Sequence, residues 1–322
     1  MKSIARMACG LLLLALTGAA LAQGYPTRPI RLIVPWPPGQ ATDLFARVVA
    51  DRLSQALGQP IVADNRAGAG GSIGSDIVAK SPPDGYTLLA GSSGPISIMP
   101  NLQTTPYDPL KSFAPIALCI YNPYILVSNP AFPAANAKEL IEAVKANPNK
   151  YAFSSSGTGA TSHLVSELFH SMAGIAPTHV PYKGSSPSLT DVMSGQVSYT
   201  FETSAAVLPF VKSGRLKAYG VTTAKRTATM PDVPTIADTA GLTGFDMAAW
   251  GGFMAPAGTP REIVNRISAE IKKALEDPAT RERLLALGMD VEYKSPEDFA
   301  VFLAREGVRY GAIAKKANIR LD

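Results

Sequence analysis

The amino-acid sequence predicts an α/β fold with parallel β-strands arranged in two domains. Short apolar runs of strand composition alternate with amphipathic runs of helical period along most of the chain, and turns rich in glycine, serine or proline separate them. This alternation is typical of parallel sheets covered by helices. The chain has 322 residues, which is more than one hydrophobic core usually serves, so we expect two domains.

The expected elements follow from apolar periodicity and from the turn residues that bound each run. Asp84-Gly85 precedes one strand, for example, and Asn147-Pro148 ends one helix. The expected strands are 30–34, 60–63, 86–90, 113–119, 124–128, 151–154, 179–181, 197–201, 216–222 and 252–255. The expected helices are 44–57, 73–80, 138–146, 162–172, 188–194, 205–213, 260–275, 280–287 and 299–315.

Residues 1–22 have the composition of a cleaved signal peptide. Lys2 and Arg6 form a basic start, 11–16 is a short apolar run, and Ala20-Leu21-Ala22 resembles a cleavage site. The apolar run is too short to span a bilayer. We therefore expect export, and a mature chain that works outside the cytoplasm.

The charge and cysteine content limit the class of protein. Loss of Lys2 and Arg6 lowers the formal net charge from +5 to +3, far below that of a nucleic-acid-binding protein, so no nucleic-acid partner is expected. Removal of 1–22 also leaves Cys119 as the single cysteine, so no internal disulfide is expected. The apolar neighbours of Cys119 indicate a buried thiol.

The stretch 34–43 links the first expected strand to the first long helix. It holds Pro38, Gly39 and Gln40, with Thr42 expected as the helix cap and Asp43 beside it. The unpaired N–H groups of a first helical turn and the helix dipole favour an anion. Because the turn has no lysine or arginine, we expect backbone and hydroxyl donors to hold a small carboxylate there.

Other strand ends carry similar chemistry. Hydroxyl-rich turns follow four further expected strands, at 92–93, 154–162, 182–187 and 201–204. In the second of these, Thr161 or Ser162 is the expected helix cap. The carboxyl ends of parallel strands meet at one edge, so these turns would converge on one crevice. The alternative is that serine, threonine and glycine only populate turns and caps.

Several motifs together resemble the Bug family of periplasmic solute receptors, the binding components related to tripartite tricarboxylate transporters. The matching motifs are Tyr25-Pro26-x-Arg28-Pro29-Ile30, Val34-Pro35-x-Pro37-Pro38-Gly39, Thr42-Asp43, Asn65-Arg66, Gly68-x-Gly70-Gly71, Pro83-Asp84-Gly85-Tyr86-Thr87-Leu88, His179-Val180-Pro181-Tyr182-Lys183-Gly184, Pro231-Asp232-Val233-Pro234-Thr235 and Ala255-Pro256-Ala257-Gly258-Thr259-Pro260. The resemblance covers essentially the whole mature chain in order.

The resemblance implies a two-lobed periplasmic-binding-protein-like fold of type II, a Venus flytrap with a mixed sheet flanked by helices in each lobe. Lobe 1 would hold 23–124 and 249–322, and lobe 2 would hold 125–248, with crossings near 122–125 and 248–251. It also implies a monomeric receptor in the periplasm of a Gram-negative bacterium, with no catalytic residue, cofactor or metal. The ligand would be a small carboxylate, aliphatic or aromatic, delivered to tripartite tricarboxylate transporter membrane subunits or to a membrane sensor.

Ligand-binding residues carry over from the family position by position. The ligand-binding residues of lobe 1 would be Pro38, Gly39, Thr42 and Asp43. Those of lobe 2 would be Ser154, Thr158, Gly159, Thr161, Lys183, Gly184 and Ser185. Ser92, at the end of its strand, is a further candidate.

Three further candidates are Trp36, Gln40 and Glu202, and two readings are open for Trp36 and for Glu202. The family usually has phenylalanine in place of Trp36 and glycine in place of Gln40. Trp36 would stack on an aromatic ligand or anchor the loop by packing, and Gln40 adds an amide donor and acceptor to the turn. Glu202 would meet a ligand ammonium or amide, or form a salt bridge at the rim.

Other functional classes have weaker support in the sequence. The stretch 68–74 resembles a dinucleotide fingerprint, but its third glycine falls one place late and the acidic partner is not evident. His163 and Glu167 lie four apart on a helix, but three histidines and no further ligand cluster do not favour a metal site. An exported hydrolase is the alternative from another class, although no serine lies in a Gly-x-Ser-x-Gly turn.

Overall fold

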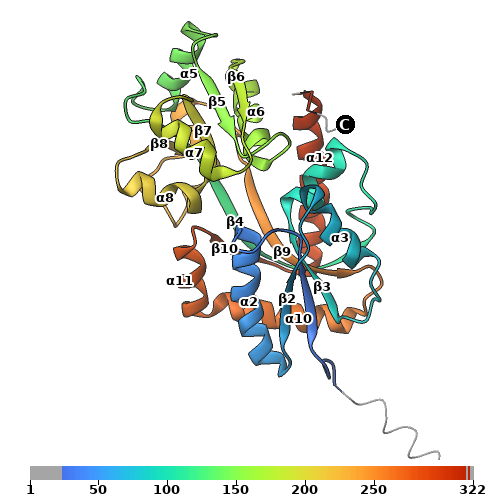
Figure 1. Cartoon of the computed structure of the whole chain (residues 1–322). Coiled ribbons are helices and arrows are strands. Elements are labelled where there is room, and N and C mark those ends of the chain that lie inside the picture. Colours follow the sequence, from blue (N-terminus) through green and yellow to red (C-terminus); the bar gives the residue numbers. More distant parts are fainter. Residues whose placement is uncertain (1–23, 317, 320–322) are drawn as a thin grey trace, which may run out of the picture.

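The structure is a computed structural model that describes residues 24–316 together with 318 and 319. The predicted signal peptide, 1–22, lies outside these residues. Within the described part, no helix has both the length and the apolar character that a membrane crossing requires. Figure 1 shows two lobes, each built from strands with helices packed around them.

The strands form one curled mixed sheet with the order β2-β1-β3-β9-β4-β7-β5-β6, and β10 and β8 also pair with β4. The strands are β1 (Ile30–Val34), β2 (Ile61–Asn65), β3 (Thr87–Ser92), β4 (Phe113–Ser128), β5 (Ala152–Ser155), β6 (Thr178–Pro181), β7 (Tyr199–Thr203), β8 (Lys217–Val221), β9 (Ala248–Pro256) and β10 (Asp290–Lys294). The helices are α2 (Ala41–Leu57), η2 (Ala69–Gly71), α3 (Ser72–Ala79), η3 (Gly94–Ile98), α4 (Met99–Leu102), α5 (Ala137–Ala146), α6 (Thr161–Ala173), α7 (Ser185–Ser194), α8 (Ser204–Lys212), α9 (Ile236–Ala240), α10 (Arg261–Glu276), α11 (Pro278–Ala286) and α12 (Pro296–Lys316). The predicted α/β class is confirmed.

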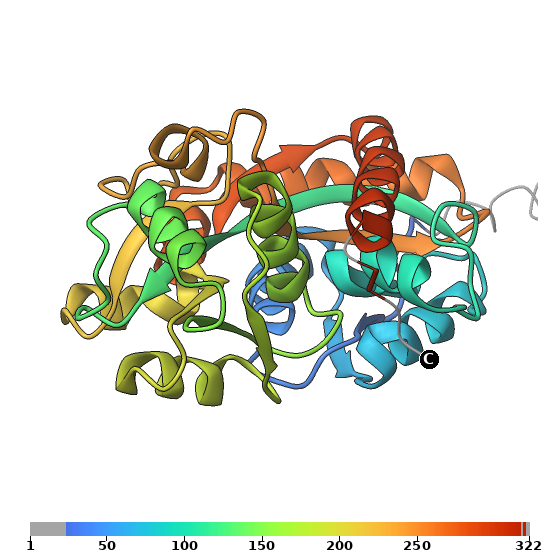
Figure 2. The ribbon, with the colours of Figure 1, turned by 90° about the horizontal axis from the view of Figure 1, so that it is seen from above.

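The first lobe is built around β1, β2 and β3, which are mutually parallel, with β9 antiparallel to β3. Helices α2 and α10 pack together beside this sheet (Figure 2). Phe45 and Leu53 of α2, Leu32 of β1 and Ile271 of α10 belong to one buried cluster. The apolar residues recur at helical spacing along α2, so one face of this helix is buried.

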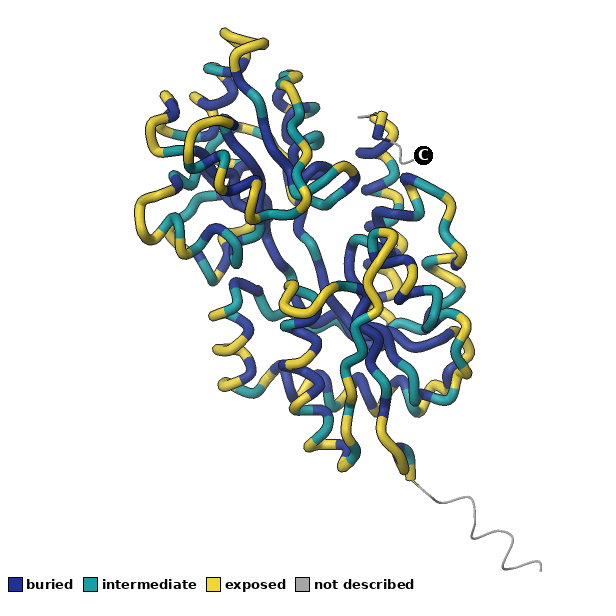
Figure 3. The backbone as a smooth tube through the Cα atoms, in the orientation of Figure 1, coloured by how far each residue is buried: buried dark blue, intermediate teal, exposed yellow. Residues whose placement is uncertain are grey.

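The second lobe is built around β5, which runs parallel to both β6 and β7. Its core includes four phenylalanines that are nearly inaccessible to solvent: Phe153, Phe169, Phe201 and Phe245. Figure 3 shows buried residues running through both lobes, with exposed residues at the turns and along the outer helices.

Two strands, β4 and β9, run through the junction of the lobes (Figure 1). β4 is one strand, although the sequence predicted separate strands at 113–119 and 124–128. Its residues up to Pro123 pair with β9, and its residues from Tyr124 pair with β7. Pro123 lacks an N–H, but it lies where β4 changes partner, so the ladder tolerates it.

The last helix contacts both lobes. Tyr310 and Ile313 of α12 share a hydrophobic cluster with Phe153 and Phe201 of the second lobe. The sequence assigned 249–322 to the first lobe, and the residue boundaries of the two lobes remain a prediction.

Candidate ligand-binding site

The polar strand ends of both lobes point toward the junction. In the first lobe, Ser92 at the end of β3 pairs with Gly251, and Gly251 pairs with Ile120 of β4. In the second lobe, Thr203 at the end of β7 pairs with Tyr124 of β4. Ile120 and Tyr124 are four residues apart, about 13 Å along an extended strand at about 3.3 Å per residue. The topology therefore places the strand ends of the two lobes on opposite sides of the point where β4 passes from one lobe to the other.

The turn between β1 and α2 is exposed from Pro37 to Gln40. Gln40 is the N-cap, with an extended backbone and no side-chain capping bond, and α2 begins at Ala41. The predicted Thr42 cap is therefore wrong, since Thr42 already lies inside the first helical turn. The N–H groups of that turn lack carbonyl partners in their own helix, which keeps them suited to an anion.

Asp43 lies under this turn and is only 2% exposed. Its Oδ2 accepts the Gly39 N–H at 2.9 Å, and its Oδ1 accepts Arg47 Nε and Asn65 Nδ2, each at 2.9 Å. Burial alone would raise the pKa of Asp43, but the hydrogen bonds from Arg47, Gly39 and Asn65 outweigh it and lower the pKa. Asp43 is therefore ionised, and its buried carboxylate holds the conformation of the turn.

Trp36 and Ser92 are joined at the base of the same turn. Trp36 Nε1 donates to Ser92 Oγ at 2.9 Å, and the indole packs against the first-lobe core. The main-chain carbonyl of Trp36 accepts Asn65 Nδ2 at 2.9 Å. These contacts favour the loop-anchoring reading of Trp36. Ser92 is itself buried, with its hydroxyl engaged by the indole.

In the second lobe, the turn between β5 and α6 contains both exposed and buried residues among those predicted to bind the ligand. Thr158 is exposed, whereas Ser154 is buried and its Oγ accepts the Ser188 hydroxyl at 2.8 Å. Ser154 therefore supports the turn from below.

The start of α6 also differs from the prediction. Ala160 is the N-cap and forms no side-chain capping bond, so the predicted cap at Thr161 or Ser162 is wrong. Ser162 Oγ instead accepts the Ser156 N–H at 3.0 Å, across the turn. Thr161 is half-buried as the first helical residue.

A second helix starts beside this turn. Gly184 is the N-cap of α7 with φ +116°, and its N–H donates to the Ser156 carbonyl at 3.1 Å, which ties the two turns together. Lys183 is exposed. The first-turn N–H groups of α6 and α7 are therefore neighbours at the edge of the second lobe.

Glu202 lies one residue before the end of β7, next to these turns, and is 1% exposed. Its Oε2 accepts the Ser185 hydroxyl at 2.8 Å, while Oε1 has no hydrogen-bond partner in the described part of the chain. Burial raises the pKa of Glu202 to about 7, against the hydrogen bonds from Ser185 and the Thr203 N–H. Among the described residues it forms no salt bridge, so the rim reading is not observed.

Tyr124, on β4, lies close to Glu202. Burial, followed by the charge of Glu202, raises the pKa of Tyr124, while a hydrogen bond with Thr161 acts in the opposite direction. The crossing strand, the end of β7 and the start of α6 therefore meet at one place.

Several supporting residues were not singled out from the sequence. Arg47 and Asn65 lock Asp43, and Arg47 Nη2 donates to Asn65 Oδ1 at 2.8 Å. Asn65 did appear in one of the family motifs. His163, which the sequence suggested only as a possible metal ligand, supports the second-lobe turn, since the Gly159 N–H donates to its Nδ1 at 3.2 Å. Its other nitrogen, Nε2, lies 3.8 Å from Glu167. No group of three metal-ligating side chains is found within the residues that the structure covers.

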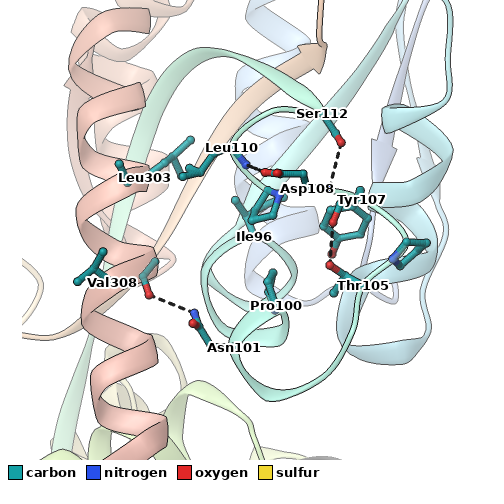
Figure 4. Close-up of a pocket in the computed structure, with 14 residues that line it drawn as sticks. Ile96, Pro100, Asn101, Thr105, Tyr107, Asp108, Leu110, Ser112, Leu303 and Val308 are labelled. Atoms are coloured by element: carbon teal, nitrogen blue, oxygen red, sulfur yellow. Dashed lines mark hydrogen bonds between the residues drawn. The ribbon is translucent and has the colours of Figure 1, made fainter.

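A separate hollow lies between α12 and the segment around α4 (Figure 4). It has a volume of about 800 Å³ and is lined by residues such as Asn101, Tyr107 and Val308. None of the predicted ligand-binding residues lines it. The strand ends at the junction of the lobes remain the better candidate for an anion because they supply unpaired donors.

Comparison with known proteins agrees with this architecture. The model of the tripartite tricarboxylate transporter family receptor matches residues 45–319. Protein BugT of Bordetella pertussis is 38% identical over 305 residues, which is 93% of this chain and 92% of BugT.

Two solved structures with bound ligands are also similar. Rpa4515 of R. palustris with adipate is 36% identical, with a TM-score of 0.81, over 92% of this chain and 99% of that chain. MatC of Rhodopseudomonas palustris with bound malate is 33% identical, with a TM-score of 0.77, over 90% and 99%. The predicted Bug-type resemblance and the periplasmic-binding-protein fold are confirmed, and the chain belongs to the tripartite tricarboxylate transporter receptor family of solute-binding proteins.

Proposed function

We propose that this protein captures a small carboxylate between its two lobes outside the cytoplasm and delivers it to a tripartite tricarboxylate transporter in the membrane. The observation that carries the proposal is the arrangement of three helix N-termini, those of α2, α6 and α7, at strand ends on both sides of the β4 crossing. Such termini bind anions through N–H groups and helix dipoles without a buried cation.

The ligand class follows from the presence of one set of donors in each lobe. One carboxylate would bind the turn from Pro38 to Thr42, with the exposed Gln40 amide beside it. A second carboxylate would bind the start of α6 and α7, where Thr158 and Lys183 are exposed. The bound adipate and malate of Rpa4515 and MatC are dicarboxylates, which supports an aliphatic dicarboxylate here. The half-buried, packed Trp36 gives less support to an aromatic ligand.

A thermal-shift screen followed by calorimetry tests this proposal. Adipate and malate are the first probes, and adipamide is the matched control because it has the length of adipate without its charge. We expect a dicarboxylate to raise Tm and adipamide to have no effect. Equal stabilisation by adipamide, or none by any di- or monocarboxylate, would contradict carboxylate capture.

Export and delivery have their own tests. N-terminal sequencing of protein from the periplasmic fraction should start after Ala22, which would locate the cleavage site that the sequence predicts. Deletion of the cognate transporter subunits should abolish uptake of the ligand. If uptake is unchanged while ligand-dependent signalling requires the receptor, the partner is a membrane sensor.

One contact bears on the hydrolase alternative. Ser155 Oγ lies 2.7 Å from His179 Nε2, a distance also found in nucleophile–base pairs. Ser155 is buried, however, and its hydroxyl donates to the Gly157 carbonyl and accepts the Gly157 N–H. This pair therefore supports the turn. Turnover of esters by the purified protein, lost on Ser155→Ala, would overturn this assignment.

A further inference from the structure

All three histidines of the chain meet behind the turn between β5 and α6. The rings of His163 and His179 stack with their centroids 4.1 Å apart, and Phe153 stacks on His179 at 4.7 Å. His170 contacts the edge of Phe153, with centroids 4.4 Å apart. The two stacked rings come from different elements, α6 and β6.

Two of these histidines hold the two ends of the turn. At its start, His179 Nε2 is hydrogen-bonded to Ser155 Oγ at 2.7 Å. At its end, His163 Nδ1 accepts the N–H of Gly159 at 3.2 Å. Gly159 is buried and has φ +75°, so few other backbone arrangements would give this N–H the same direction.

The bond to Gly159 fixes the protonation state of His163. A ring nitrogen that accepts a hydrogen bond carries no proton, so Nδ1 is bare and His163 is the neutral tautomer with hydrogen on Nε2. In an imidazolium both nitrogens are donors, and Nδ1 would then repel the Gly159 N–H. A charged His163 is therefore incompatible with this position of the turn.

We propose that His163 and His179 are positioning residues for the ligand-binding turn between β5 and α6, and that protonation of His163 releases this turn. The inference rests on the proposed function, because it assigns the turn to ligand binding. It adds that the receptor holds its ligand less tightly in acidic medium.

The charged surroundings of the pair support neutral rings at neutral pH. Burial lowers the pKa of His163, and His170 adds to this effect, while Glu167 opposes it. Burial, followed by His163, lowers the pKa of His179 to about 4, and Glu167 again opposes. Tyr199 of β7 is a further titratable neighbour, and its hydroxyl is hydrogen-bonded to His170 Nε2 at 2.9 Å.

The sign of the pH effect follows from this lowered pKa. With the turn held, burial keeps the pKa of His163 below the ordinary histidine value of about 6.5. We infer that release of the turn exposes the ring to water, so that its pKa returns toward that value. The held turn is therefore fully favoured above about 6.5, and this preference is lost as the pH falls through the lowered pKa. A ligand that requires the held turn loses affinity over the same range, by at most about tenfold per pH unit for one proton.

The test uses NMR of the ligand-free full mature chain, so it does not depend on the identity of the ligand. Between pH 8 and pH 4.5, the Gly159 amide signal should shift together with the His163 ring signals. In His163→Asn, whose side-chain oxygen replaces the Nδ1 acceptor but does not titrate, the Gly159 signal should stay constant. His170→Gln is the matched control, because His170 does not contact the turn, and it should keep the titration of Gly159.

Calorimetry with adipate at pH 7.5, 6.5 and 5.5 tests whether ligand affinity follows the same protonation. We expect the affinity of the wild type for adipate to fall as the pH is lowered, and the affinity of His163→Asn to change much less. Protonation of adipate itself is the same in both experiments, so it does not explain a difference between the two proteins. The inference would be overturned if the Gly159 amide signal does not change with pH in the wild type, or if it still titrates in His163→Asn. If Gly159 titrates but no carboxylate binds, the histidine inference stands and the proposed function fails.

Discussion

The Asp43 carboxylate and the Gly39 N–H are joined at 2.9 Å across the start of α2, and this bond ties the exposed turn to a buried charge. The same carboxylate accepts Arg47 and Asn65. The shape of the turn therefore depends on a residue that is itself shielded from solvent and ligand.

Replacement of Asp43 by alanine should loosen the turn. Asp43→Ala leaves the Gly39 N–H and the Asn65 amide without their acceptor, so we expect a loss of about 1–3 kcal/mol in the free energy of unfolding and weaker ligand binding. Urea denaturation and calorimetry measure both quantities. Asp51→Ala is the control: Asp51 lies on the same helix, but its contact with Arg283 is exposed, so both quantities should stay nearly unchanged. Equal effects of the two substitutions would contradict the role of Asp43.

Gly39 has φ +83° and open space around its Cβ position, so only its backbone conformation and its exposure to ligand restrict substitution. Gly39→Val should cost about 1–2 kcal/mol of stability and abolish ligand binding, because a branched side chain covers the N–H donors. Gly58 ends the same helix with φ +68° and equally open space, so Gly58→Val is a matched control for strain. It should lose similar stability and keep its ligand affinity. Unchanged affinity in Gly39→Val would remove this turn from the site.

Glu202 should make stability depend on pH with the opposite sign to a carboxylate whose pKa is lowered in the fold, such as Asp43. Its pKa is raised from 4.5 to about 7, so its neutral form is favoured in the fold. The stabilisation by the neutral carboxyl is fully present below about 4.5 and is lost as the pH rises to about 7.

Glu202→Gln, which stays neutral, should therefore gain stability relative to the wild type between pH 5 and pH 8, by about 2–3 kcal/mol. Thermal or urea unfolding of both proteins at several pH values measures the difference. If the difference stays constant across this range, Glu202 does not titrate as described.

The hydrogen bond from Trp36 Nε1 to Ser92 Oγ is open to a double-mutant cycle. Trp36→Phe and Ser92→Ala should each lower the free energy of unfolding, with a coupling of about 0.5–1.5 kcal/mol for this bond. Because the indole packs as an anchor, Trp36→Phe should change adipate affinity by less than about threefold. A much larger loss of affinity with little loss of stability would favour stacking of Trp36 on the ligand.

The sequence is informative where a local pattern decides the structure. The 30–34 strand, the proline- and glycine-rich turn and the following helix are all present, because turn residues and apolar period agree there. The helix cap was misplaced by two residues, since Thr42 has a capping side chain but Gln40 has the extended backbone of an N-cap.

Other features depend on partners that are distant in sequence. β10 was missed even though its sequence, Asp290-Val291-Glu292-Tyr293-Lys294, alternates charged and apolar residues as a half-buried strand does, because five residues are a short signal and the partner strand β4 is distant in sequence. The histidine stack was missed for a similar reason. His163 and His179 lie on separate elements, and their contact results from the parallel pairing of β5 and β6.

The continuous β4 strand also determines how the molecule unfolds. In the first lobe β4 lies between β9 and β10, and in the second lobe it lies between β7 and β8. It supplies a residue to each of the four hydrophobic clusters, with Ile116, Leu118, Leu126 and Ile125 as examples. Loss of the sheet in one lobe frees one half of β4, while the other half lies inside the sheet of the other lobe. We therefore expect the unfolding of the two lobes to be coupled.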